Sequence, residues 1–252
     1  MHYAAWGGDI DAIRALKGAG EDVSLEDEFG RTPAHYAACG GHLSAIQELK
    51  KEGADIFARD WRGMTPVLFA AGFGKLDVVK WLVEKDKSCV VSIFFEAGRN
   101  KRTDIMKWLI ETELVDVNVK MKYDYTPLHL AARTGDLDLV QLLLEREARV
   151  EEKADMGYTA LLFAAENGHL DVIKELVAAN ADVNAKLEQG STILHRAAAG
   201  GDLHVVRWLV EVLKVDVNVK YGDGVTASEL ANFFGNLDVF DYLHHRAMSA
   251  SG

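Results

Sequence analysis

Short apolar stretches alternate with polar, glycine-marked turns along this chain of 252 residues. Within residues 31–56, an alanine-rich stretch is followed by Leu43, Ile46 and Leu49, which recur at helical spacing. Gly41, between the two apolar stretches, suits the left-handed conformation that ends a helix. The pattern predicts a short first helix, a tight turn, a second helix and an extended polar loop.

A threonine opens the first helix of each unit. The Thr32 side chain can accept a hydrogen bond from a free first-turn N–H group, and Pro33 fits the first helical position. Equivalent threonines stand at Thr32, Thr65, Thr126, Thr159, Thr192 and Thr226. Their separations are 33, 61, 33, 33 and 34 residues, and 61 equals 33 plus 28. Because one such unit cannot bury its apolar face alone, this period predicts stacked repeats.

Glycines and alanine pairs return with the same period. The turn glycine is Gly30, Gly63, Gly157, Gly190 and Gly224, and the alanine pairs begin at Ala37, Ala70, Ala131, Ala164 and Ala197. These motifs resemble the ankyrin repeat family, whose pattern is D-x-x-G-x-T-P-L-H-x-A-A-x-x-G-H, an apolar second helix and G-A-D-V-N. The resemblance implies an all-α solenoid of stacked helix-turn-helix units with short β-hairpin loops.

The period divides the chain into eight repeats of one ankyrin-repeat domain over residues 1–252. The expected repeats are 1–26, 27–59, 60–87, 88–120, 121–153, 154–186, 187–220 and 221–246, and we expect residues 247–252 to fray.

Two of the eight repeats depart from the pattern. The first begins in mid-motif, since His2 and Gly8 precede His35 and Gly41 by the same 33 residues. In the fourth, Trp81 and Trp108 are 27 residues apart, six short of 33. We therefore expect a short first helix and a truncated or absent hairpin in the fourth repeat.

The composition narrows the class of partner. Lys and Arg number 28 against 39 Asp and Glu, a net charge of −11, which argues against wrapping nucleic acid. The charge is compatible with a basic protein partner, and solubility explains it as well. No apolar run approaches the ~18 residues of a membrane span, and Met1 leads directly into repeat sequence, so we expect no membrane insertion and no leader. We expect a monomer in the cytoplasm, with the nucleus as the alternative.

Catalytic chemistry finds little support in the motifs. Gly72 to Lys75 resembles a phosphate loop, but the upstream glycine and the Ser or Thr after Lys75 are missing. His35, His129 and His195 occupy the T-P-L-H position, where the resemblance implies a structural hydrogen bond with threonine and backbone. We expect no enzyme activity, no cofactor and no metal site.

The resemblance instead implies a binding groove made of hairpin tips and first helices. Carried over residue by residue, the expected partner-binding residues are Phe29, Arg31, Trp61, Arg62, Met64, Phe73, Tyr123, Tyr125, Arg133, Met156, Tyr158, Glu166 and Tyr221. Aromatic residues, Met and Arg are the types that dominate protein interfaces. We take Tyr123, Tyr125 and Tyr158 as the centre of the groove. The alternative is that the tip aromatics pack on the next hairpin.

These observations predict a non-catalytic protein–protein interaction scaffold. The alternative is a targeting or regulatory segment of a larger enzyme, channel or translocated effector. Asn184, with Leu176 eight residues before it, also resembles the asparagine that an oxygen-dependent hydroxylase modifies in ankyrin proteins. The other interpretation is that Asn in this position stabilises a turn by hydrogen bonding.

Overall fold

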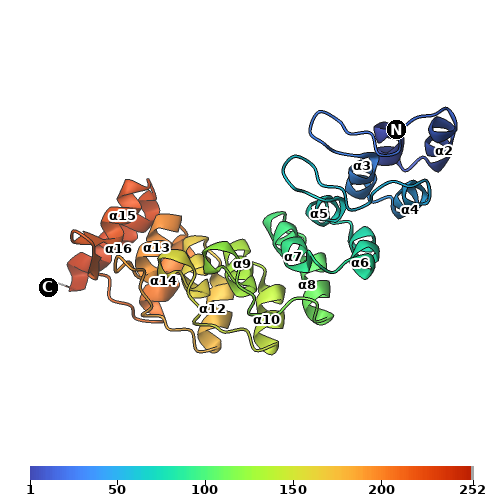
Figure 1. Ribbon diagram of the computed structural model, residues 1–252. Coiled ribbons are helices and arrows are strands. Elements are labelled where there is room, and N and C mark those ends of the chain that lie inside the picture. The colour runs from blue at the N-terminus through green and yellow to red at the C-terminus, as the bar shows by residue number, and fades with distance from the viewer. Residues whose placement is uncertain (251–252) are drawn as a thin grey trace. The chain divides into compact units, whose positions relative to one another are not determined.

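The computed structural model describes residues 1–250, and its contacts divide the chain into two compact units, Met1–Val115 and Asp116–Gly252. Both are built almost entirely of α-helices (Figure 1), which confirms the predicted all-α class. The single domain expected from the sequence stays a prediction.

The N-terminal unit is a two-layer stack of helices. Its elements are α1 (His2–Gly7), α2 (Ile10–Gly18), α3 (Pro33–Gly40), α4 (Leu43–Lys51), α5 (Pro66–Gly72), α6 (Leu76–Lys85), α7 (Val90–Arg99) and α8 (Thr103–Glu111). The first helices α1, α3, α5 and α7 pack in order in one layer, and the second helices α2, α4, α6 and α8 form the other (Figure 1). Fully buried Ala37 and Ala38 let α3 lie close to its neighbours.

The C-terminal unit repeats this arrangement. Its elements are η1 (Lys122–Asp124), α9 (Pro127–Thr134), α10 (Leu137–Glu145), η2 (Asp155–Gly157), α11 (Ala160–Glu166), α12 (Leu170–Ala178), α13 (Ile193–Gly200), α14 (Leu203–Glu211), β1 (Lys220–Tyr221), β2 (Val225–Thr226), α15 (Ala227–Phe233) and α16 (Leu237–Ala250). Helices α9, α11, α13 and α15 pack in order, while α10 packs on α12 and α14 on α16. Strands β1 and β2 form a short antiparallel hairpin.

The fourth repeat lacks its hairpin, as expected, but its first helix is not short. Only residues 86–89 separate α6 from α7, and α7 has ten residues against six to eight in the other first helices. The missing residues therefore come from the loop alone. Helix α7 has no Thr-Pro start, and its apolar Ile93 and Phe94 are fully buried, so packing stabilises it without a side-chain cap.

The last helix continues through Ala250 and so includes most of the segment that we expected to fray. Ser251 and Gly252 lie outside the described residues. Within residues 1–250, no helix is both long and apolar enough to cross a membrane.

Candidate functional site

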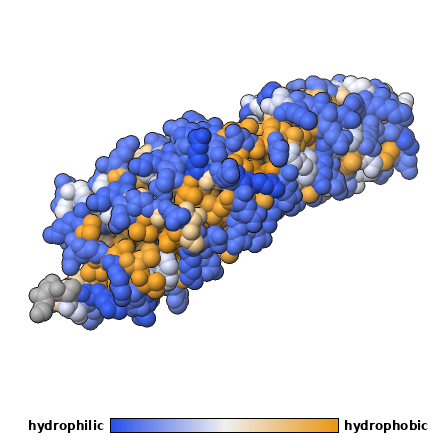
Figure 2. All heavy atoms as spheres, turned by 90° about the horizontal axis from the view of Figure 1, so that it is seen from below, coloured by the Kyte–Doolittle hydropathy of each residue, from blue (hydrophilic) through white to orange (hydrophobic). Residues whose placement is uncertain are grey.

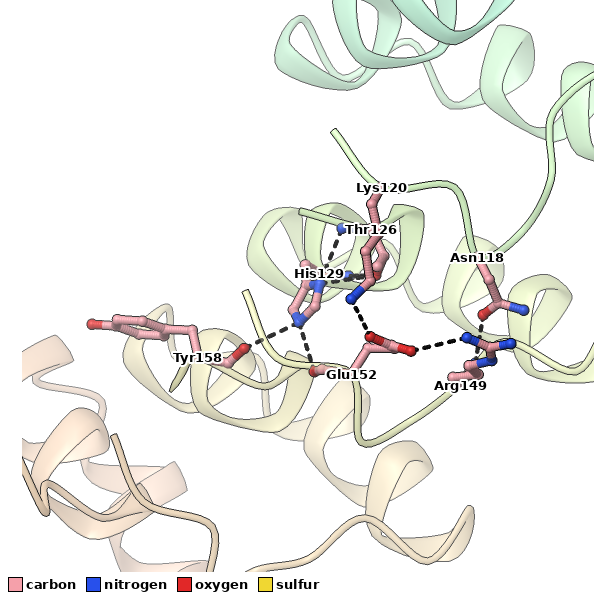
Figure 3. A network of polar contacts seen from close by, with 7 residues as sticks. All are labelled: Asn118, Lys120, Thr126, His129, Arg149, Glu152 and Tyr158. Atoms are coloured by element: carbon pink, nitrogen blue, oxygen red, sulfur yellow. Dashed lines mark hydrogen bonds and ion pairs between the residues drawn. The ribbon is translucent and has the colours of Figure 1, made fainter. Parts of the chain in front are cut away.

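Threonine–histidine pairs fix the start of three first helices. In the C-terminal unit, the Thr126 N–H donates to His129 Nδ1 at 3.1 Å, and the Thr126 hydroxyl lies 2.8 Å from the same nitrogen (Figure 3). Because Nδ1 accepts the backbone N–H, the ring proton lies on Nε2. His129 Nε2 then donates to the carbonyl oxygens of Glu152 and Tyr158, at 3.0 and 3.1 Å. This confirms the structural bond predicted for His129.

His35 and His195 make the same contacts. The Nδ1 atoms lie 3.0 Å from the Thr32 hydroxyl and 2.8 Å from the Thr192 hydroxyl, and Nε2 of His35 lies 3.0 Å from the Met64 carbonyl oxygen. Burial lowers the pKa of His35, His129 and His195, which keeps the imidazoles neutral. These histidines hold hairpins in place and are not free for catalysis.

Ion pairs fix the loop beside His129. Glu152 accepts from Lys120 Nζ at 2.7 Å and from Arg149 Nη1 at 3.2 Å (Figure 3). The Arg149 N–H donates to Asn118 Oδ1 at 2.8 Å. Asn118 therefore stabilises a turn by hydrogen bonding, as one interpretation of Asn at this repeat position predicts.

Tyr123 and Met156 stand at equivalent hairpin tips, 33 residues apart, in an unusual backbone conformation. Their φ angles are 65° and 60°, in the left-handed region that bulky residues rarely adopt. Both side chains are nevertheless exposed, by 60% and 48%. The first of these tips also has Asp124, with φ 55°, where the second has Gly157. Two large hydrophobic side chains are thus held towards solvent on strained tips.

Tyr125 and Tyr158 are only partly exposed and pack around Phe163. The Phe163 ring centre lies 4.4 Å from that of Tyr158, nearly parallel to it, and 5.1 Å from that of Tyr125. The Tyr125 hydroxyl is buried without a hydrogen-bond partner among the described residues, and burial raises the pKa of Tyr125 to about 12. Tyr125 thus packs on a helix of the next repeat and Tyr158 on a helix of its own repeat. The contact of either tyrosine with a partner stays a prediction.

Charged side chains border this aromatic cluster. Arg196 Nη1 donates to the Tyr158 hydroxyl at 3.3 Å and lies 3.7 Å from Glu166 Oε1. Its Nε donates to Ser191 Oγ at 3.1 Å. The Arg133 guanidinium carbon lies 5.4 Å from the centre of the Tyr125 ring. Four expected site residues, Tyr125, Arg133, Tyr158 and Glu166, are thus held together by Arg196 and Phe163.

Arg31 in the N-terminal unit forms an ion pair with Asp27. Its Nη2 and Nε contact Asp27 Oδ2 at 2.7 and 2.8 Å, and the Tyr36 hydroxyl donates to the same oxygen at 2.7 Å. Burial alone would raise the pKa of Asp27, but these bonds hold it below its usual range. The Arg31 guanidinium carbon also lies 4.7 Å from the exposed Phe29 ring.

Other expected residues of this unit remain accessible. Trp61 is 74% exposed, Arg62 and Phe73 are exposed and Met64 is half-buried. Arg62, Met64 and Phe73 line one hollow. On the face of the molecule drawn in Figure 2, hydrophobic residues gather between hydrophilic ones.

Two expected residues of the C-terminal unit have different surroundings. The Tyr221 ring is half-buried and lies edge-on to His195, with centres 4.7 Å apart. Asn184 is exposed, and its N–H donates to Asp182 Oδ1 at 2.9 Å. The proposed hydroxylation of Asn184 stays a prediction.

The residues that hold the expected binding residues in place were not among those expected from the sequence. Tyr36, Phe163 and Arg196 each follow the repeat threonine by four residues, so the period contains a signal for them. The position faces the hairpin and carries different residue types, which concealed it. Among residues 1–250, no three His, Cys, Asp or Glu side chains are grouped to hold a metal ion.

Family models match most of the chain. A model described as ankyrin repeats in three copies matches residues 1–92 and 94–187, and a single ankyrin repeat matches residues 189–221. A segment of 61 residues is 39% identical to alpha-latrocrustotoxin-Lt1a of Latrodectus tredecimguttatus. Another of 57 residues is 40% identical to alpha-latroinsectotoxin-Lt1a of the same species. These segments cover 24% and 23% of the chain and 4% of each toxin.

Proposed function

The chain belongs to the ankyrin repeat family, and we propose that it is a non-catalytic scaffold whose hairpin tips and first helices bind a protein partner. Ankyrin repeats in general mediate protein–protein interactions and are not enzymes. A rigid stack loses little conformational entropy on binding, because the contacting side chains are already positioned.

The backbone conformation of Tyr123 and Met156 is the observation that supports binding at particular residues. Tyr123 and Met156 are exposed hydrophobic side chains on left-handed backbone, a conformation that costs ~1–2 kcal/mol per residue. Glycine would relieve this strain, and folding alone gives no reason to keep an exposed Tyr or Met there. Strain retained at an exposed position supports a binding role. The side chains of Arg133 and Glu166 add charged groups for orientation.

The test replaces these two residues by glycine in the full chain. Tyr123→Gly and Met156→Gly should each weaken binding to a captured partner, by ~2 kcal/mol or about 30-fold in Kd if both are hot spots. The melting temperature should stay equal or rise, because the strain is removed. Binding is measured by calorimetry with a partner isolated by affinity capture on the wild-type chain.

Glu147→Gly is the matched control, because Glu147 also has left-handed backbone (φ 62°) and is exposed but lies at the end of a second helix. It should leave partner affinity unchanged. Loss of partner affinity in the Glu147→Gly chain, or full affinity in both tip variants, would contradict the proposal.

The alternative function keeps some support. The two toxins contain matching segments that form a small part of much longer chains. In this alternative, the repeats are a targeting or regulatory segment of a larger enzyme, channel or translocated effector. Sequencing the complete transcript tests this, since a reading frame that continues into a second domain would favour it.

A further inference from the structure

Two hairpin tips are each joined to the tip of the following repeat by a backbone hydrogen bond. The Trp61 N–H donates to the Phe29 carbonyl oxygen at 3.1 Å, and the Glu188 N–H donates to the Met156 carbonyl oxygen at 3.1 Å. Both bonds join the same two positions of adjacent repeats, because the acceptor stands three residues before its repeat threonine and the donor four. The tips of Phe29 and Met156 therefore each present one carbonyl oxygen to the next tip.

The hairpin tip of the third repeat has no following hairpin in the N-terminal unit. Arg62 stands three residues before Thr65, at the acceptor position, but the fourth repeat has only residues 86–89 between α6 and α7. Within the described part of the chain, no backbone N–H donates to the Arg62 carbonyl oxygen. The place that a fourth hairpin would fill is left beside α5.

A hollow of about 250 Å³ is lined by residues of this tip, of α5 and of the C-terminal end of α7 with the turn after it. Its apolar wall includes Met64, Phe69 and Phe73, and its polar lining includes Arg62, Arg99 and Arg102. Glu96 is the acidic residue in the lining, so the lining has three arginines against one carboxylate. The hollow is basic although the whole chain has a net charge of −11.

Only Arg99, of the three arginines, lies close to the carboxylate of the hollow. Arg99 Nη1 lies 3.7 Å from Glu96 Oε2 while its side chain is 70% exposed. Arg102 Nε donates to the Gly72 carbonyl oxygen at 3.0 Å, a contact that leaves its charge unbalanced. Arg62 is exposed and forms no ion pair with the described residues. Guanidinium groups with free N–H donors are suited to carboxylates.

We propose that this hollow binds an extended acidic segment of a protein partner, which takes the place of the missing hairpin. A backbone N–H of the segment donates to the Arg62 carbonyl oxygen, an apolar side chain packs on Phe69 and Phe73, and carboxylates pair with Arg62 and Arg99. The inference rests on the proposed scaffold function and gives the partner chemistry at this hollow. It differs from the basic partner that the net charge suggested.

The experiment selects peptides of about twelve residues from a random phage-displayed library on the full chain, with an excess of soluble Arg62→Glu chain as competitor. The recovered peptides should be enriched in Asp and Glu. Their Kd, measured by fluorescence anisotropy, should rise at least about tenfold with Arg62→Glu and several-fold with Arg99→Gln. Raising the salt from about 50 to about 300 mM should weaken binding.

Lys17→Glu makes the same charge change at a position that does not line the hollow and should leave the Kd unchanged. Circular dichroism melts confirm that each variant folds. A library that yields no acidic peptide, or acidic peptides that bind the Arg62→Glu chain equally well, overturns the inference. Tyr123→Gly should not affect these peptides, so failure here is distinct from failure of the tip-binding proposal.

Discussion

At the scale of single residues, the buried histidines make stability depend on pH. Burial lowers the pKa of His129, so the unfolded chain takes up its proton before the folded chain does. The free energy of unfolding should therefore fall as the pH drops from 7 towards 5, through the unfolded pKa of about 6.5. Urea titrations across this range measure the slope.

His129→Gln is the informative variant, because glutamine can still cap the helix but does not titrate. It should show a smaller loss of stability between pH 7 and pH 5 than the wild-type chain. Carboxylates such as Glu48, whose pKa the bonds from Arg14 lower to about 2, change charge below this range. An unchanged slope in His129→Gln would contradict the assignment.

Tyr125 offers a second test at this scale. Its buried hydroxyl has no hydrogen-bond partner among the described residues, and a buried unsatisfied polar group costs about 1–3 kcal/mol. Tyr125→Phe should keep the packing on Phe163 and raise the free energy of unfolding, measured in urea, by up to about 1 kcal/mol. A loss of stability would show that the hydroxyl has a partner. Tyr125→Ala should destabilise the fold, because the ring contacts would be lost.

At the scale of elements, two helix starts with the same Thr-Pro pair differ in their caps. The Thr126 hydroxyl bonds to His129, whereas the buried Thr65 hydroxyl has no partner among the described residues. Thr126→Ala should cost about 1–2 kcal/mol of unfolding free energy, and Thr65→Ala clearly less. Parallel urea titrations compare them, and equal losses would contradict the argument.

Helix α7 shows that packing can replace such a start. The side chain of Cys89, which precedes the first residue of α7, makes no capping bond, yet the helix is longer than its equivalents. Buried Ile93, Phe94 and Phe95 bind it to the neighbouring helices. A deletion in the loop therefore removed a hairpin without shortening the helix.

At the scale of the whole molecule, the chain should not unfold in one step. In a repeat array, stability is a sum of repeat and neighbour terms. The N-terminal unit contains the repeat without a hairpin, so it should unfold at lower urea. Trp208 is the one tryptophan after Val115. In a variant whose other tryptophans are replaced by phenylalanine, the fluorescence of Trp208 reports on the C-terminal unit. In Trp208→Phe, the remaining tryptophans report on the N-terminal unit.

Fluorescence of these two variants should give different urea midpoints, the lower one for Trp208→Phe. Circular dichroism of each variant, which follows both units, is the control for altered stability. Coincident midpoints would indicate a single cooperative unit.

The sequence by itself determined the period of the repeats, the two helices of each repeat and the loss of the hairpin in the fourth repeat. The bonds of His35, His129 and His195 were implied by the resemblance to the ankyrin repeat family. These features depend on local capping and on contacts with the adjacent repeat, which a fixed period places at a constant offset.

The tertiary structure alone decided which tip residues are free. Tyr123, Tyr125 and Tyr158 are all expected tip residues in sequence, but Phe163 packs on Tyr125 and Tyr158 while Tyr123 faces solvent. The length of α7 and the basic hollow beside Arg62 were also hidden. Exposure depends on which side chains the adjacent helices supply at each contact, and the spacing of the repeats does not contain that information.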